Sequence, residues 1–375
     1  MLITDLDTRH YRIPLRTTMT DSTHGDMTHF EVVMVRLRTR DGVEGLGYTY
    51  TIGYGGAAIR SLIEETLKPI VVNHDARRVE HLWEQMWWRL HYVGRGGLAS
   101  FAISAVDVAL WDLIGKHDGV PFWRLLGGYC NTVKVYIGGI DLHLTLEQLL
   151  KQTEQNLERG YKAIKIKVGQ PRVRHDIQRV KAVRELIGPD IRLMVDANMR
   201  WNVETSIRAA RQLREYDVYW LEEPTIPDDV PGHARIALEG GVPIATGENL
   251  HTIYEFRNMI ENGHIAFPEP DVSNIGGITN WMRVAKLAHA HNLSVTTHGV
   301  HELHLQLLAA IPNASYLEIH SFGLERFILN APELKDGHMA AGEAPGHGVL
   351  FDWHALEPYL VSPRQEAAIP FVSAN

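Results

Sequence analysis

The sequence predicts an α/β protein in which a (β/α)8-type, modified TIM barrel follows an α+β domain. From about residue 132, short apolar runs alternate with amphipathic helical segments, and eight such runs occur. Repeated βα units imply a parallel sheet, and eight of them fit a closed barrel. An open doubly wound sheet is the competing architecture. It would normally have a glycine-rich phosphate turn after its first strand, which "YIGGIDLH" at residues 136–143 matches poorly.

The N-terminal part, residues 1–128, is predicted to be the α+β domain. Residues 29–51 alternate apolar and polar side chains around Asp41 and Gly42, which indicates a hairpin. Helical spacing of apolar residues follows in 57–71 and 79–90. Residues 98–116 are apolar on nearly every side, so we expect a buried helix there.

The barrel is predicted for residues 129–330. Helical patterns separate the eight apolar runs, and the chain after about Asn330 has no βα rhythm, so we expect 331–375 to pack back on the first domain. The eight candidate strands are residues 132–140, 163–169, 191–198, 218–224, 243–249, 265–273, 293–299 and 316–321.

Composition excludes several classes of function. The net charge is −8 and no long basic run occurs, so nucleic acid is not an expected partner. Cys130 is the single cysteine, so an internal disulfide is impossible. The sequence pattern predicts no apolar run long enough to span a bilayer, and the first residues lack the pattern of a secretory signal. We therefore expect no membrane partner and a cytoplasmic location.

Three carboxylates follow three successive candidate strands. Asp196, Glu222 and Glu248 are each 26 residues apart, close to one βα repeat. Barrel enzymes place their chemistry at the C-terminal ends of strands, so the three acids should converge and repel one another. A hard divalent cation such as Mg²⁺ removes that conflict, and no thiolate or histidine pair supports zinc. The alternative is that each acid caps the helix after its strand.

Two lysines alternate along the second candidate strand, "AIKIKVG". Taken alone, this pattern also fits an exposed antiparallel strand with a wet face. In a barrel strand, however, Ile164 and Ile166 would face the helices and leave Lys165 and Lys167 inside. Two neighbouring ammonium groups lower each other's pKa. We therefore assign proton transfer to Lys167, near the strand end, with Lys165 as its electrostatic neighbour.

A histidine and an aspartate are predicted on the other side of the barrel. Asp271 on the sixth strand could accept a hydrogen bond from the imidazole of His298 on the seventh, which would fix its tautomer. As a lone feature, a histidine in "TTHGVHELH" would more often be structural.

These residues resemble those of a known family. The lysine pair, "DAN", "LEEP", "GEN", "PDVSNIGGIT", "THG" and the "LE" of the eighth strand are similar to the enolase superfamily, and more narrowly to its mandelate racemase subgroup. The resemblance implies a capping domain completed by the C-terminal tail and a homo-oligomer, a dimer or an octamer. It implies the following site residues: Mg²⁺ ligands Asp196, Glu222 and Glu248; acid/base groups Lys167 and the His298–Asp271 pair; Glu318 on the substrate carboxylate beside Lys165; and Asn198 as a polar contact near the metal.

The chemistry implied is removal of a proton next to a carboxylate, with Mg²⁺ stabilising an enediolate. Residues 16–30 and 48–57 are polar or glycine-rich segments that suit lids, although ordinary surface loops look the same. Polar lids favour a small-molecule acid sugar, an aldonate or aldarate, dehydrated to a 2-keto-3-deoxy acid. The alternative is a racemase or epimerase of a 2-hydroxy acid. A binding module without turnover and a hydrolytic metal barrel are further rivals, but filled acid/base positions and carboxylate-rich strand ends speak against them.

Overall fold

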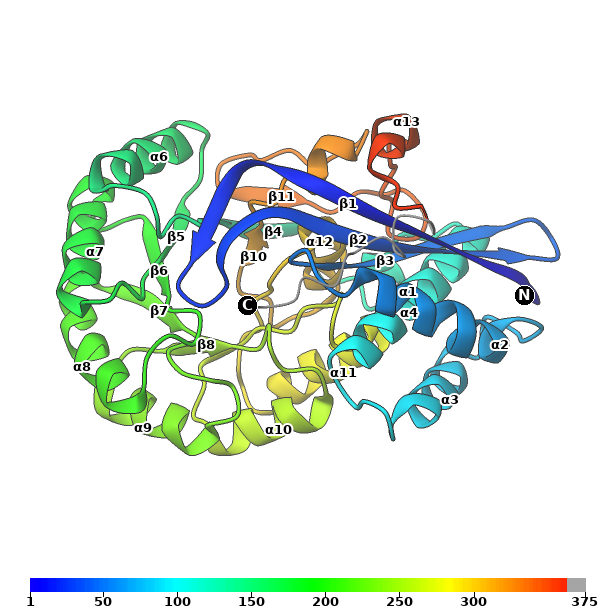
Figure 1. Ribbon diagram of the computed structural model, residues 1–375, viewed down its shortest axis with the longest axis horizontal. Coiled ribbons are helices and arrows are strands. Elements are labelled where there is room, and N and C mark those ends of the chain that lie inside the picture. Colours follow the sequence, from blue (N-terminus) through cyan, green and yellow to red (C-terminus); the bar gives the residue numbers. More distant parts are fainter. Residues whose placement is uncertain (363–375) are drawn as a thin grey trace, which may run out of the picture.

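The computed structural model describes residues 1–362 and shows two packed parts (Figure 1). The N-terminal part is a three-stranded antiparallel sheet in the order β1-β2-β3 with helices on one side. Its elements are β1 (Ile3–Asp21), β2 (Gly25–Thr39), β3 (Glu44–Thr51), α1 (Gly56–Leu62), a π-helical turn (Ile63–Leu67), α2 (Lys68–Val71), α3 (Val79–Leu90), α4 (Leu98–Asp118) and α5 (Phe122–Leu125).

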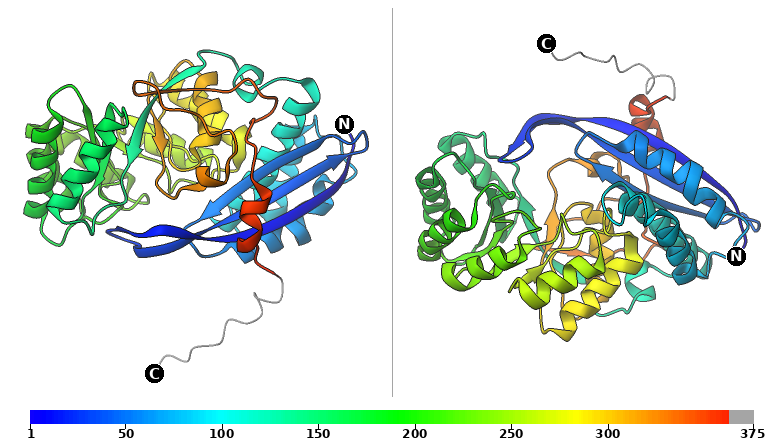
Figure 2. Two further views of the ribbon diagram at one scale, coloured as in Figure 1. Left: turned by 90° about the horizontal axis from the view of Figure 1, so that it is seen from above. Right: turned by 60° about the horizontal axis from the view of Figure 1, so that its bottom comes forward.

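Two hairpins organise this sheet. The predicted turn at Asp41 and Gly42 is confirmed, because Arg38 of β2 pairs with Glu44 of β3. The segment 16–30, expected to be a lid loop, is instead mostly strand. β1 and β2 stay paired to their tip, where Asp21 pairs with Gly25. The tip extends from the N-terminal part across the barrel (Figures 1 and 2). A paired hairpin holds its tip more firmly than a free loop would.

Helix α4 is the buried helix that the sequence predicts. It has 21 residues and a mean hydropathy of 1.6, so by length and composition alone it could cross a membrane, contrary to our first expectation. Its apolar window is 83% buried inside the protein, which identifies it as a core helix. Glycines in β3 let it approach the sheet closely: a Cβ on Gly47 would lie 2.1 Å from the carbonyl oxygen of Ala105.

The second part is a curled parallel sheet in the order β10-β4-β5-β6-β7-β8-β9, surrounded by helices. This confirms the fold predicted for it, a barrel of the TIM type. The strands are β4 (Thr132–Gly138), β5 (Ala163–Lys167), β6 (Arg192–Asp196), β7 (Val218–Glu222), β8 (Ile244–Thr246), β9 (Phe267–Pro268) and β10 (Leu317–Ile319). The helices are α6 (Leu146–Glu158), α7 (Val173–Ile187), α8 (Val203–Leu213), α9 (Val230–Gly240), α10 (Ile253–Asn262), α11 (Gly277–Ala290) and α12 (His301–Ala310), with 3₁₀ turns at Arg214–Tyr216 and Leu324–Phe327.

The seventh predicted strand, residues 293–299, is not a regular strand, so that prediction is wrong in detail. The segment still lies between its expected neighbours. The amide of Thr296 donates to the carbonyl of Pro268 at 3.1 Å, and its hydroxyl donates to the carbonyl of Tyr316 at 2.9 Å. Threonine hydroxyls thus replace part of the backbone ladder here. The irregular backbone leaves His298 at the mouth of the barrel, between β9 and β10.

The chain after β10 contacts both parts. β11 (His338–Ala340) pairs antiparallel with β4, which the sequence did not predict. Beyond it, the amide of His347 donates to Asp112 of α4 at 3.0 Å, and Val361 donates to His10 of β1 at 2.8 Å. A short helix, α13 (Trp353–Leu356), and a 3₁₀ turn (Glu357–Tyr359) lie between these contacts. Residues 363–375 of the predicted C-terminal segment lie outside the described residues, and the domain limits at 128 and 330 stay predictions.

Candidate active site

Three carboxylates meet at the C-terminal ends of neighbouring barrel strands. Asp196 ends β6, Glu222 ends β7, and Glu248 follows β8 by two residues. One oxygen from each lies within 4.8 Å of the others, and Asp196 and Glu222 are completely buried. The sequence-based expectation that these side chains converge agrees with this placement. Their role as metal ligands remains a prediction.

The donor set fits a hard cation. Burial raises the pKa of Glu222 to about 8; Lys165 opposes the rise, and Asp196, Glu318 and Glu248 add to it. Oδ1 of Asn198 is a buried oxygen without a hydrogen-bond partner among the described residues, and Oε2 of Glu248 has no hydrogen bond there either, although Nε2 of His298 lies 3.4 Å from it. Mutually repelling carboxylates and free oxygens are what Mg²⁺ stabilises.

Lys165 and Lys167 point into this cluster from β5, whose five residues are all buried. The wet-strand alternative is therefore wrong. Lys165 Nζ contacts Glu222 and lies 3.0 Å from Oε1 of Glu318, while Lys167 Nζ contacts Asp196. Burial lowers the pKa of Lys167, but Asp196 more than compensates, so the pKa is raised. The predicted lowering by Lys165 is outweighed in this arrangement, because the carboxylate contacts the ammonium group directly.

His298 and Asp271 form the predicted pair. Nδ1 of His298 lies 3.1 Å from Oδ2 of Asp271, and its Nε2 lies 3.4 Å from Oε2 of Glu248. The amide and hydroxyl of Ser273 both donate to the other oxygen of Asp271, at 2.8 and 2.7 Å. Burial lowers the pKa of His298, whereas Glu248 and Asp271 raise it, to about 10 overall. The imidazole is thus held at the Glu248 end of the carboxylate cluster, and Lys167 at the Asp196 end.

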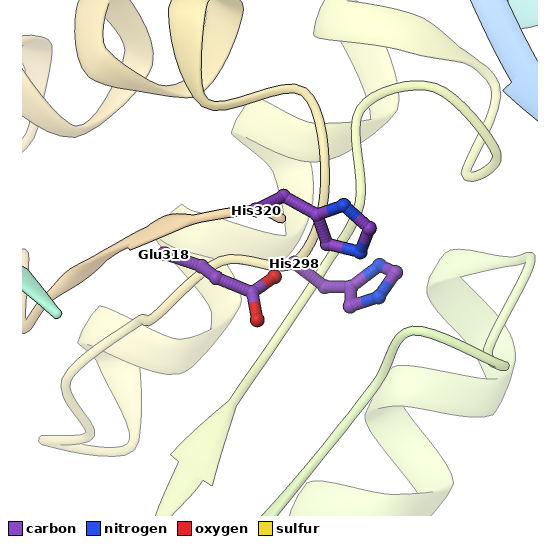
Figure 3. Close-up of side chains that lie close together, drawn as sticks. All are labelled: His298, Glu318 and His320. Atoms are coloured by element: carbon purple, nitrogen blue, oxygen red, sulfur yellow. The ribbon is translucent and has the colours of Figure 1, made fainter. Parts of the chain in front are cut away.

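Glu318 lies on β10 beside these groups. Its Oε2 accepts the amide of Gly299 at 3.0 Å, and although burial raises its pKa, Lys165 and His298 hold the pKa well below the usual range. Figure 3 shows Glu318, His298 and His320 turned toward one another; one ligand atom from each lies within 4.8 Å of the others. Burial lowers the pKa of His320 to about 3, so this imidazole is neutral at ordinary pH.

Three side chains at the site were not singled out from the sequence. Tyr50 of β3 donates to Oδ2 of Asp271 at 3.2 Å. His24 lies at the tip of the β1–β2 hairpin, whose Ser22 hydroxyl donates to the carbonyl of Ala197 at 2.8 Å. His320 follows Glu318 by two residues. Tyr50 and His24 belong to the segments predicted as lids, and His320 shares the strand face of Glu318, so the sequence held a signal for each.

Comparison with known proteins identifies the family. Residues 3–127 match the mandelate racemase / muconate lactonizing enzyme N-terminal domain, and residues 148–355 match the enolase C-terminal domain-like family. The chain belongs to the mandelate racemase / muconate lactonizing enzyme family. The resemblance to the enolase superfamily and its capping-domain-plus-barrel fold are thereby confirmed.

Several relatives are acid-sugar enzymes. The chain is 51% identical to 3,6-anhydro-alpha-L-galactonate cycloisomerase of Streptomyces coelicolor, over 92% of this chain and 96% of that protein. It is 36% identical to L-talarate/galactarate dehydratase of Salmonella typhimurium, over 90% and 85%.

Solved structures of relatives contain magnesium. A racemase from Streptomyces coelicolor A3(2) with bound magnesium superposes with a TM-score of 0.94 at 50% identity, covering 96% of this chain and all of that one. A talarate/galactarate dehydratase variant liganded with Mg and L-glucarate has a TM-score of 0.91 at 33% identity, covering 96% and 92%. The family is an enzyme family that uses Mg²⁺, which confirms the predicted cofactor.

Proposed function

We propose that the protein catalyses β-elimination on an acid sugar. The proton next to the carboxylate, at C2, and the oxygen substituent at C3 leave, and the enol product tautomerises to a 2-keto-3-deoxy acid. The observation that supports this most is the placement of two proton-transferring groups, Lys167 and His298, at opposite ends of one carboxylate cluster. Asp196, Glu222 and Glu248 would hold Mg²⁺, which would stabilise the negative charge that develops on the substrate carboxylate.

Each site residue has its own role in the proposed reaction. Although burial lowers the pKa values of Lys167 and His298, carboxylates raise them overall and fix the positions of both side chains. A cation on Asp196, Glu222 and Glu248 would offset that attraction, so that Lys167 or His298 could lose its own proton and take the one at C2. Lys165, whose Nζ lies 3.0 Å from Glu318, would bind the substrate carboxylate from the β10 side, and Glu318 would donate a hydrogen bond to that carboxylate after taking up a proton. Asn198 offers a buried free oxygen beside Asp196. Burial of the whole cluster strengthens each of these charge interactions relative to water.

Two leaving groups are compatible with this chemistry. In a 3,6-anhydro sugar acid, the oxygen leaving C3 stays attached at C6, so the ring opens and no water is released. In an open-chain aldonate or aldarate the C3 hydroxyl leaves as water. The 51% identical cycloisomerase favours the first reaction, and the more distant dehydratases favour the second. We propose ring opening as the first activity to test and dehydration as the second.

Racemisation or epimerisation of a 2-hydroxy acid is a second candidate function. Proton transfer from both ends of the cluster permits it, because a proton removed on one face of the substrate could return on the other.

The oligomeric state and the cellular location of the protein stay predictions: a homo-oligomer in the cytoplasm.

The test is incubation of the purified protein with 3,6-anhydro-L-galactonate, galactarate and a set of open-chain aldonates in D₂O with MgCl₂. Proton NMR follows exchange at C2, and semicarbazone absorbance follows the 2-keto product. We expect 2-keto product from at least one substrate and its loss on adding EDTA. Exchange or inversion at C2 without 2-keto product would favour the racemase, and no reaction at C2 on any acid would contradict both.

A further inference from the structure

The tip of the β1–β2 hairpin contains a second aspartate–histidine pair. Nδ1 of His24 lies 2.8 Å from Oδ2 of Asp21. Oδ1 of the same carboxylate accepts the amides of Thr23 and His24 at 2.8 and 2.6 Å. The carboxylate is therefore fixed by the turn and in turn orients the imidazole. Among the described residues, Nε2 of His24 has no hydrogen-bond partner, so this nitrogen is free to meet a ligand.

The hairpin tip is attached to the mouth of the barrel. The Ser22 hydroxyl donates to the carbonyl of Ala197 at 2.8 Å, and the Thr23 hydroxyl donates to the carbonyl of Asn198. Both acceptors directly follow Asp196. On the other side of the tip, the amide of Leu142 donates to the carbonyl of Thr20 at 3.1 Å. These contacts hold His24 over the end of β6, where Figures 1 and 2 show the hairpin crossing the barrel.

The charges of the site act on this imidazole. Asp21 raises the pKa of His24, partial burial lowers it, Glu248 raises it further, and Lys167 lowers it. His24 thus lies within the reach of the charges of Glu248 and Lys167, and its side chain is still 31% exposed. An imidazole that a carboxylate orients and that also reaches solvent can give up a proton and recover it.

We propose that His24, oriented by Asp21, is the acid that protonates the oxygen leaving C3. This inference rests on the proposed function. An ether or hydroxyl oxygen leaves poorly as an anion, so elimination requires a proton donor in addition to the base at C2. As the base takes the C2 proton, the C2–H electron pair forms the C2–C3 double bond. The C3–O pair departs with the oxygen, which takes the Nε2 proton of His24. Solvent then reprotonates the imidazole.

The experiment compares His24→Asn with the wild type on two kinds of substrate. The first is the acid sugar that the wild type converts. The second is its analogue with fluorine at C3, because fluoride leaves without protonation. His29→Asn, on the same hairpin, is the matched control; its ring contacts the carbonyl of Gly53. Three rates are measured: 2-keto product formation, deuterium exchange at C2 of unreacted substrate, and fluoride release.

For His24→Asn we expect product formation from the oxygen substrate to fall by about 10²- to 10⁴-fold, the usual range for a general acid. Fluoride release should stay within about threefold of wild type, and exchange at C2 should persist, because the base is intact. Asp21→Asn should show the same pattern with a smaller loss, since the imidazole remains but is less well oriented. His29→Asn should match the wild type throughout.

Two results would overturn the role of His24 while leaving the proposed function intact. One is unchanged product formation in His24→Asn. The other is an equal fall in product, fluoride release and C2 exchange, which would mean that the residue serves binding or the fold. Failure of the proposed function looks different, since the wild type itself would then give neither product nor exchange, and the inference would fall with it.

Discussion

Four carboxylates of the site each have a cation of the chain beside them, and these cations are fewer than the carboxylates. Four carboxylates share two ammonium groups and one imidazole: Asp196, Glu222, Glu248 and Glu318 against Lys165, Lys167 and His298. Burial raises the pKa of Glu222 to about 8, and the negative charges of Asp196, Glu318 and Glu248 add to the rise. Such a cluster is unfavourable unless a further cation joins it.

At the same scale, Lys167→Ala and His298→Ala should each leave a folded protein with little turnover. Each replacement removes one proton-transferring group and leaves the other in place. We expect the rate of 2-keto formation to fall by about 10²- to 10⁴-fold in both. Lys162→Ala, an exposed lysine just before β5, is the matched control and should keep the wild-type rate. Full activity in both mutants, with melting curves like the wild type, would contradict the mechanism.

Tyr50 is expected to position the His298–Asp271 pair. Its hydroxyl lies 3.2 Å from Oδ2 of Asp271 and 3.3 Å from Nδ1 of His298. Tyr50→Phe removes a hydrogen bond to a charged group, commonly worth about 1.5–3 kcal/mol, so kcat should fall by about 10- to 100-fold. Because the hydroxyl contacts the side of the imidazole away from Glu248, KM should change less than about threefold. If Tyr50→Phe increased KM and left kcat unchanged, the Tyr50 hydroxyl would instead be a contact to the substrate.

At the scale of the element, Glu31 joins β1, β2 and α1. Its Oε2 accepts the amide of Gly56 at 2.9 Å and the hydroxyl of Thr51 at 3.0 Å, and Oε1 lies 3.4 Å from Nε2 of His10. Burial raises the pKa of Glu31, but His10 and the Gly56 amide lower it to about 2 overall. The ionised carboxylate of Glu31 therefore stabilises the contact between the β1–β2 hairpin and the start of α1.

Glu31→Gln should destabilise the protein in a pH-dependent way. A folded-state pKa below the ordinary 4.5 means that the stabilisation is fully present above about pH 4.5 and is lost as the pH falls toward 2. At neutral pH the shift corresponds to about 3 kcal/mol. Urea unfolding at a series of pH values measures it, and the difference from wild type should shrink on acidification. Glu44→Gln, an exposed partner of Arg38, should change stability by less than about 1 kcal/mol at every pH.

For the whole molecule, the sequence predicts the barrel and the place of the carboxylates because both are periodic. Alternating βα units and acids at strand ends recur every 26 residues or so, and each signal is local in the chain. Contacts between distant segments have no such period. The pairing of β11 with β4, the Tyr50 contact with Asp271 and the attachment of the hairpin tip to Ala197 join residues more than 170 positions apart. The sequence pattern predicted a regular seventh strand at residues 293–299. It could not show the irregular backbone there, where the side-chain hydroxyl of Thr296 makes a hydrogen bond to the neighbouring segment.

The pKa of Lys167 was also misjudged from the sequence, since it depends on distances that the chain pattern does not contain. Alternation along β5 correctly placed Lys165 beside Lys167. It could not show that the Asp196 carboxylate contacts the ammonium group and outweighs the neighbouring lysine.

The last prediction concerns the stability of the whole protein with and without magnesium. Binding to the folded state alone should raise the unfolding free energy by about 2.7 kcal/mol at a Mg²⁺ concentration 100 times Kd. In Glu248→Gln that gain should be lost, because one of three converging carboxylates is gone. Without Mg²⁺ the same variant should be at least as stable as the wild type, because one repelling charge has been removed. The order of stabilities should therefore invert when MgCl₂ is added.

Thermal melts of both proteins in EDTA and in MgCl₂ measure this inversion without any assay of turnover. Asp336→Asn, which removes an exposed surface carboxylate, is the matched control and should follow the wild type in both buffers. An equal rise in melting temperature for the wild type and Glu248→Gln would place the Mg²⁺ effect outside the cluster of Asp196, Glu222 and Glu248. The proposed proton transfer by Lys167 and His298 would then need another explanation, because no Mg²⁺ would neutralise the carboxylates that lie between these two groups.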